Sequence, residues 1–221
     1  MKILALGDPH GKLPKNLDKI IKKNKIDIII CVGDIPFSPK KPWLKESWTK
    51  EVNKKADESY KQIVSKFCSY NLPIILLKGN YYIGGKGATF VRKIFKKYTN
   101  LYYKILGKIN LKGKSFVIFD DAYVFSSIRE KITKKRNTKL NKLLKENKNS
   151  ILICHNPPYG IVDKAFSGKH VGSKILLRAI KKHQPKLVLC GHIHEARGER
   201  KIGKTKIYNL GWHGDYKIIK V

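Results

Sequence analysis

KILALGDPHGK, residues 2–12, is a short apolar run that ends in a glycine, an aspartate and a histidine. The run at 2–6 has the length of a strand, and the flanking Gly7 and Gly11 allow the backbone to turn sharply around Asp8 and His10. Further apolar runs also end in glycine, aspartate, asparagine or histidine; they lie at 27–32, 73–77, 151–154 and 186–190. The segment therefore predicts the first strand of a sheet whose polar residues gather at one edge.

Lys-rich stretches with helical periodicity separate these runs. We expect helices at 14–24, 46–70, 89–98, 129–147 and 173–183, and more strands at 101–110, at 114–119 and in the tail from about residue 197. Alternation of strands and helices is typical of an α/β protein with a sheet core. The 221 residues contain no repeat, linker or low-complexity block, so we expect a single domain over residues 1–221.

Charge is the unusual feature of the composition. Lys and Arg total 48 against 16 Asp and Glu, a net charge of +32, and only 6 of the 48 are Arg. Such a charge attracts polyanions, notably nucleic acid at the basic helix 131–148. Abundant Lys, Ile and Asn are also the pattern of an AT-rich genome, and a protein that reads phosphates or bases would use more Arg. We favour genome composition for the bulk charge and keep nucleic-acid binding as the alternative.

The cellular location is predicted from segments that the sequence lacks. No apolar run approaches the roughly 20 residues of a membrane-spanning helix, and the first apolar stretch is too short for a signal peptide. We therefore expect a cytoplasmic protein without a membrane partner. The cysteines at 31, 68, 154 and 190 form no C-x-x-C pair, so we expect them to be reduced and structural. The sequence predicts no particular oligomeric state.

The polar residues after the strands predict a metal site. Ligands bind at the carboxyl ends of strands in α/β sheets, so these turns are expected to converge. Oxygen and nitrogen donors without a thiolate suit Mn, Fe, Zn or Ni. The candidate ligands are too many for one ion and suit two that share a carboxylate: Asp8, His10, Asp34, Asn80, His155, His192 and His194.

The order of these residues resembles the motif set of the calcineurin-like metallophosphoesterases. That family has D-x-H, G-D, G-N, H and G-H-x-H, which here fall at 8–10, 33–34, 79–80, 155 and 191–194. Residues 155–160, 168–173 and 189–195 are similar to those of small archaeal and bacterial phosphoesterases related to the Icc-type cyclic-nucleotide phosphodiesterases. The resemblance implies two mixed β-sheets packed face to face and flanked by helices, and hydrolysis of phosphate monoesters or diesters.

The resemblance also implies a division of the ligands between two divalent ions. Asp8, His10, Asp34 and His194 would hold one ion, and Asp34, Asn80, His155 and His192 the other, with Asp34 bridging. Mn²⁺ is the expected metal, with Fe, Zn or Ni as alternatives. Two such ions roughly 3.5–4 Å apart lower the pKa of a bridging water, and the hydroxide attacks phosphorus in line with the leaving oxygen. Asp34, Asn80 and His155 are thus assigned to catalysis, and the Asn80 amide also to binding the substrate phosphate.

One departure from the family concerns the leaving group. The family has G-N-H-D or G-N-H-E at its third motif, and its histidine helps to protonate the leaving group, whereas residues 79–82 here are Gly-Asn-Tyr-Tyr. An unperturbed tyrosine titrates near 10, so Tyr81 matches neutral pH poorly. His170, in the Gly-rich loop 168–173, is a second candidate for the acid or for a substrate contact. Arg197 is a candidate for contact with the substrate phosphate.

The missing imidazole leaves three functions open. It favours a phosphodiesterase over an alkyl monoesterase, because losing a general acid costs about 10²–10⁴ in rate. The charge allows a nuclease acting on DNA or RNA, or a basic nucleic-acid-binding protein whose metal site is structural or vestigial.

A second departure from the family, Asn-Leu-Gly-Trp at 209–212 where relatives often have Asn-Pro-Gly-Ser, affects the conformation of a turn and not the metal ligands. No motif includes His183 or His213, which we interpret as ordinary surface or core residues.

Tyr81 can be tested separately. If it stands in for a better acid, Tyr81→His will raise turnover of esters with poor leaving groups more than turnover of nitrophenyl esters, because nitrophenolate leaves without a proton. Steady-state rates on the two ester classes measure this. Equal gains on both would contradict a leaving-group role for Tyr81.

Overall fold

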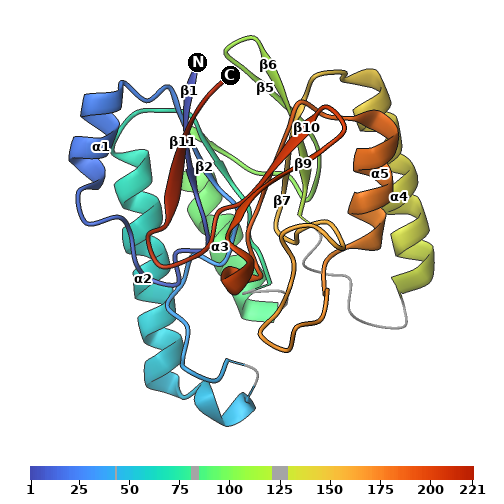
Figure 1. Ribbon diagram of the computed structural model, residues 1–221. Coiled ribbons are helices and arrows are strands. Elements are labelled where there is room, and N and C mark those ends of the chain that lie inside the picture. Colours follow the sequence, from blue (N-terminus) through green and yellow to red (C-terminus); the bar gives the residue numbers. More distant parts are fainter. Residues whose placement is uncertain (43, 81–84, 121–128) are drawn as a thin grey trace.

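Two mixed β-sheets packed face to face form the centre of the molecule, and helices cover their outer faces (Figure 1). The computed structural model describes the chain except for residues 43, 81–84 and 121–128 and the side chains of 85–88 and 129–133. The first sheet has the order β11-β1-β2-β3-β4, in which β11 is antiparallel to β1 and the other pairs are parallel. Its strands are β1 (Lys2–Leu6), β2 (Ile28–Cys31), β3 (Ile74–Leu76), β4 (Leu101–Tyr102) and β11 (Tyr216–Lys220).

The second sheet has the order β5-β6-β7-β8-β10-β9. Strands β6, β7, β8 and β10 run parallel, and β5 and β9 are antiparallel edge strands. Its strands are β5 (Leu106–Leu111), β6 (Lys114–Phe119), β7 (Ile151–Cys154), β8 (Leu187–Cys190), β9 (Gly198–Ile202) and β10 (Thr205–Asn209). The expected fold of two mixed sheets flanked by helices is confirmed.

The helices divide between the two sheets. The first sheet is covered by α1 (Leu17–Asn24), α2 (Lys50–Cys68) and α3 (Gly85–Lys97), and the second by α4 (Arg129–Glu146) and α5 (Lys174–His183). Two short 3₁₀ helices are η1 (Lys45–Ser47) and η2 (His194–Ala196). In the described part of the chain, no helix combines the length and the apolar character needed to cross a bilayer.

The apolar runs of the central strands are buried on both faces. In β2, Ile28 and Ile30 pack between the sheets, whereas Ile29 and Cys31 pack against the helices, because successive side chains of a strand point to opposite faces. Strands that are covered on both faces are therefore continuously hydrophobic rather than alternating. All four cysteines are free and buried, as expected.

The strand expected at 101–110 is in fact two strands in different sheets. Leu101–Tyr102 pairs with β3, and Leu106–Leu111 pairs with β6, so the chain crosses between the sheets in between. Helix α1 also begins later than expected, at Leu17, because Pro14 starts a turn in which its carbonyl accepts from the Leu17 amide. Helix α2 begins at Lys50, where the Thr49 hydroxyl caps it by accepting from Val52 N.

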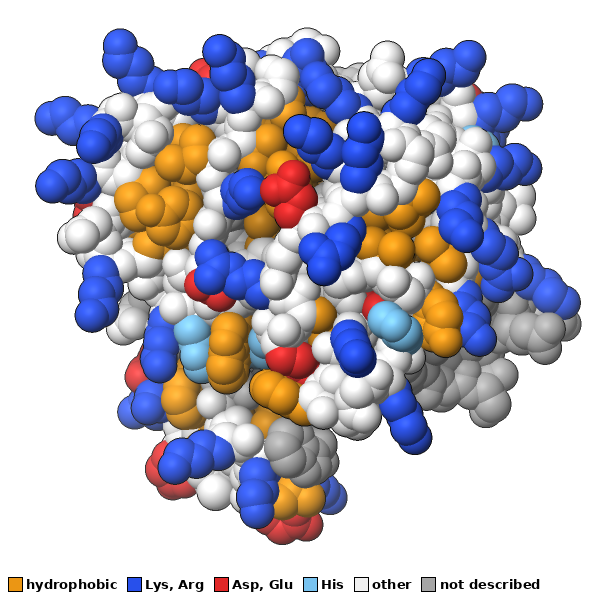
Figure 2. Space-filling model, viewed as in Figure 1, with side chains coloured by type: hydrophobic (Ala, Val, Ile, Leu, Met, Phe, Trp, Pro, Cys, Tyr) orange, Lys and Arg blue, Asp and Glu red, His pale blue; other side chains and the backbone are white. Residues whose placement is uncertain are grey.

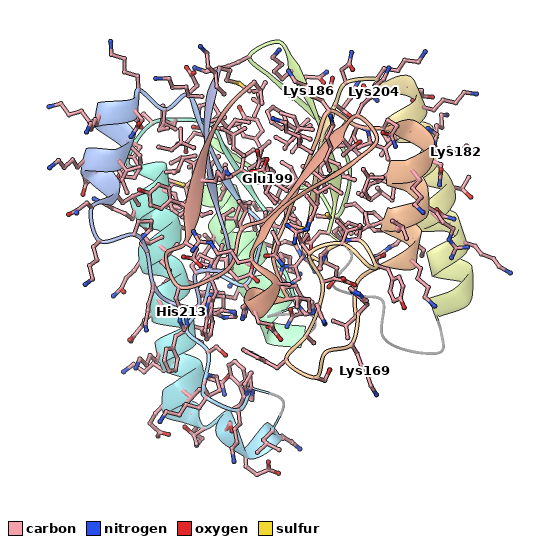
Figure 3. The ribbon with its side chains drawn as sticks, viewed as in Figure 1. Lys169, Lys182, Lys186, Glu199, Lys204 and His213 are labelled. Atoms are coloured by element: carbon pink, nitrogen blue, oxygen red, sulfur yellow. The ribbon has the colours of Figure 1, made fainter. Side chains whose placement is uncertain are left out.

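The carboxyl ends of the parallel strands lie at the same edge of the sandwich. Figure 3 places His213 and Lys169 at this lower edge, and Lys186 and Lys204 at the opposite edge. The turns that follow β1, β2, β3, β7 and β8 meet there, and backbone hydrogen bonds join them: the His10 amide donates to Asp34 O and the Gly191 amide to His155 O, both at 2.9 Å. The fold thus brings the polar strand ends of both sheets together.

Candidate metal centre

The turns that carry the candidate ligands have an unusual backbone. His10, Asp34 and His192 have φ of 45°, 44° and 69°, a left-handed region that non-glycine residues seldom adopt. Two glycines, Gly33 and Gly79, let these turns pack closely against one another. A Cβ on Gly33 (φ 130°) would lie 2.6 Å from His155 Nδ1, and one on Gly79 (φ 72°) 2.2 Å from Asp34 Oδ1. Only glycine fits at these two positions, because neighbouring ligand atoms occupy the space.

Asp8, His10 and His194 form a first group of donors. Their potential ligand atoms all lie within 4.8 Å of one another. His194 Nε2 is 3.1 Å from Asp8 Oδ2 and 3.3 Å from His10 Nε2, and Asp8 Oδ2 also accepts from the backbone of His192 at 2.6 Å. Asp8 and His10 are buried, and His194 is half-buried.

Asp34, His155 and His192 form a second group with the same compactness. His155 Nδ1 donates to the Val32 carbonyl at 2.9 Å, which turns Nε2 toward the group. That Nε2 lies 3.4 Å from Asp34 Oδ2 and 2.8 Å from Asn80 Oδ1, so Asn80 joins the group. The backbone N–H of Asn80 donates to Asp34 Oδ1 at 2.8 Å. All seven predicted ligands thus lie in these two groups.

The donor set fits divalent cations. Asp8 Oδ1 is buried and has no hydrogen-bond partner among the described residues, which is costly for a carboxylate oxygen. Beside it, His194 Nε2 is 3.1 Å from Asp8 Oδ2 and 3.3 Å from His10 Nε2, so one carboxylate and two imidazole nitrogens converge on one point. A cation would be coordinated by all three, and carboxylate and imidazole ligands without thiolate suit Mn, Fe or Zn.

The buried charges shift one another's pKa values. Burial alone would lower the pKa of His155, but attraction by Asp34 and Asp8 outweighs it and raises the pKa to about 10. Burial would raise the pKa of Asp34, but the charge of His155 lowers it to about 2. Burial and repulsion by His155 lower the pKa of His192 to about 4. Without metal at pH 7, His155 is therefore a cation beside the ionised Asp34.

The other predicted residues lie outside these two groups. His170 is on the loop between β7 and α5, where its Nδ1 is 2.6 Å from Oδ1 of the buried Asp163. Arg197, which follows η2, forms an ion pair with Asp215 at 2.8 Å. Both His170 and Arg197 line a neighbouring cleft of about 390 Å³. Tyr81 lies outside the described residues.

Sequence reasoning left open whether Trp212 lines the cleft or simply packs, and it gave no role to His213 or Asp120. The Trp212 ring stacks between His194 and His213, with centroid distances of 4.7 and 3.8 Å. No local pattern in the tail indicates this contact. Buried Asp120 accepts from the Lys78 amide at 2.9 Å, and its charge helps to raise the pKa of His155. Asp120 directly follows β6, so the rule of polar residues at strand ends could have found it.

Comparison with known protein families gives a match over the part of the chain that carries all seven candidate ligands. The family described as calcineurin-like phosphoesterase matches residues 1–196, most of the chain. The chain belongs to this family. A protein of Methanocaldococcus jannaschii named "Uncharacterized protein MJ1162" is 29% identical to this phosphoesterase over 215 residues, which cover 95% of this chain and 87% of the relative.

Solved structures resemble this phosphoesterase in fold. A dimetal phosphatase from Danio rerio has a TM-score of 0.67 at 10% identity and covers 97% of this chain and 88% of its own. The protein TT1561 of Thermus thermophilus has a TM-score of 0.61 at 16% identity, covering 96% and 90%. At such identities the likeness shows the shared sandwich fold alone.

Metal binding is predicted to release about one proton at pH 7, because a ligating imidazole must be neutral and His155 is charged in the metal-free protein. Asp34 and His192 release none, since at pH 7 Asp34 is already ionised and His192 already neutral. Apparent Mn²⁺ affinity should therefore rise as pH increases from 7 toward 10. Titration calorimetry in buffers of different ionisation enthalpy measures the proton, and His155→Asn should abolish its release. A binding enthalpy independent of the buffer would count against this prediction.

Proposed function

We propose that this protein is a phosphodiesterase that works with two divalent cations, Mn²⁺ being the expected metal. The observation that carries the proposal is the convergence of seven oxygen and nitrogen donors, in two compact groups, on one edge of the sandwich. Membership of the calcineurin-like phosphoesterase family supports the reaction class. The proposal includes a single domain over residues 1–221, which is supported by a core between the sheets that draws on both halves of the chain. It also includes a cytoplasmic location, which rests on the sequence alone.

The residues have distinct tasks in this proposal. Asp8, His10 and His194 hold one cation, Asp34, Asn80, His155 and His192 hold the other, and Asp34 is the expected shared ligand. Two bound cations supply a nucleophile at neutral pH and neutralise charge on the phosphoryl oxygens. The Val32 carbonyl keeps His155 Nε2 turned toward the centre. The Asn80 side-chain amide binds a phosphate oxygen of the substrate.

His170 is the proposed proton donor to the leaving oxygen. Its Nδ1 is engaged by Asp163 Oδ1, which leaves Nε2 as the atom that carries the transferable proton. Asp163 is held in turn by the backbone amides of Gly160 and Gly172, which donate to its Oδ2 at 2.9 and 2.8 Å. This fixed imidazole supports a role in catalysis, and Arg197, in the same cleft, is the proposed contact for a second part of the substrate.

A nuclease is the second candidate function, favoured by the net charge of +32. Binding of nucleic acid with a vestigial metal site is less well supported, because all seven donors are retained and Asp8 Oδ1 is buried without a hydrogen-bond partner among the described residues. A phosphodiesterase for small substrates and a nuclease would use the same metal centre and would differ in the size of the substrate.

Purified protein with Mn²⁺ is expected to hydrolyse bis-p-nitrophenyl phosphate, and EDTA to stop the reaction. Asp34→Asn and His155→Ala should reduce hydrolysis to background, because each removes a ligand of the second group. His183→Ala is the matched control, since that imidazole hydrogen-bonds Asn141 on α4 and is expected to leave the rate unchanged. Full activity in either ligand variant, measured by nitrophenolate absorbance, would refute the proposal.

His170→Gln should lower kcat for diesters with poor leaving groups by about 10²-fold or more, with a smaller effect on nitrophenyl esters. His183→Gln again serves as control. A His170 that only contacts substrate would raise KM and leave kcat unchanged, and that result would remove it from the acid role.

A further inference from the structure

A groove of about 660 Å³ lies between α1 and β11, outside the metal centre. Its lining is mostly polar, and its apolar part includes the half-buried side chains of Ile20, Tyr216 and Ile218, which pack on the core of the first sheet. Figure 2 shows this region at the left of the molecule, where apolar side chains are bordered by basic ones. A groove with a charged border and an apolar part suits a ligand that is itself amphipathic.

Three exposed lysines form one rim of the groove: Lys15, Lys19 and Lys23. Lys19 and Lys23 are one helical turn apart on α1, which spaces their charges by about 6 Å along the groove. None of the three forms an ion pair within the described part of the chain. Asp215, which also lines the groove, is already paired with Arg197 at 2.8 Å. The groove therefore offers uncompensated positive charge in a row.

One end of the groove lies close to the first donor group. His213 lines the groove and stacks on Trp212, which stacks on the candidate ligand His194. The His213 ring is also 6.0 Å from the ring of His10. A chain lying in the groove would thus approach the group of Asp8, His10 and His194.

We infer that this groove binds the backbone of a single-stranded nucleic acid whose phosphodiester is cut at the metal centre. The inference rests on the proposed function and names its substrate class. A positive rim that follows the phosphates and an aromatic side chain on which a base can stack are the two elements of single-strand binding, and the groove offers Lys15, Lys19 and Lys23 for the first and Tyr216 for the second. A duplex fits less well because its bases face inward, away from Tyr216 and Ile218.

The inference is tested with Lys19→Gln/Lys23→Gln. The comparison variant is Lys135→Gln/Lys139→Gln, an exposed pair with the same spacing and charge on α4, the basic helix that is the rival surface for nucleic acid, on the opposite side of the molecule. The measured quantity is the ratio of kcat/KM on a short labelled oligothymidylate to kcat/KM on bis-p-nitrophenyl phosphate. We expect the groove variant to lower this ratio about tenfold and to make the slope of log(kcat/KM) against log[salt] shallower by about 1.4. The α4 variant should keep the ratio of the unaltered protein.

Three results would overturn the inference: an unchanged ratio in the groove variant, an equal fall in the α4 variant, or stronger binding to anionic phosphatidylserine vesicles than to the oligonucleotide. Fluorescence anisotropy of the same oligonucleotide in EDTA measures binding without turnover. If no ester is hydrolysed with any metal, the proposed function is refuted, while anisotropy still shows whether the groove binds the oligonucleotide. If the ester is hydrolysed but the groove variant binds the oligonucleotide as well as the unaltered protein does, the inference about the groove is refuted and the proposed function is not.

Discussion

The buried carboxylates of Asp8 and Asp34 need positive charge close to them. Leaving a charge buried and unpaired destabilises a fold by several kcal/mol. In the metal-free protein His155 supplies that charge, with its Nδ1 3.8 Å from Asp8 and its Nε2 3.4 Å from Asp34. The neutral imidazole of His192 and an Asp8 oxygen that is buried without a hydrogen-bond partner among the described residues remain around this cation. The group is therefore only partly compensated by protons, and divalent cations would complete it.

The rest of the fold holds these candidate ligands in place although three of them have a strained backbone conformation. A left-handed backbone costs about 1–2 kcal/mol at a non-glycine residue, and His10, Asp34 and His192 all adopt it. Two sheets that are buried on both faces fix the strand ends from which these turns start. The amide of Asn209 adds to this by donating to Val162 O and Ile193 O at 3.0 and 2.8 Å, which ties the neighbouring loops together.

The strands and the convergence of the candidate ligands could be predicted from sequence because both depend on local features: an apolar run, then a glycine, then a donor. The crossing of residues 101–110 between sheets could not, because both halves are apolar and nothing local says which sheet each half joins. The contacts of Trp212 and His213 could not be predicted either, since the sequence left open whether Trp212 lines the cleft or packs. These contacts follow from the tail folding back on the first turn, where the Asp8 amide donates to Gly211 O and the His213 amide to Asp8 O.

The scarcity of arginine and the groove on α1 are compatible. Arginine is favoured where a protein reads bases or grips one phosphate in a fixed bidentate geometry. A site that cuts a backbone irrespective of sequence needs neither, and the mobile, strongly hydrated ammonium of lysine suits contacts that form and break as the strand moves. The lysine-rich composition thus supplies suitable side chains. What distinguishes Lys19 and Lys23 is their place, along a groove that also contains Tyr216 and His213, and His213 stacks on Trp212 beside the candidate ligand His194.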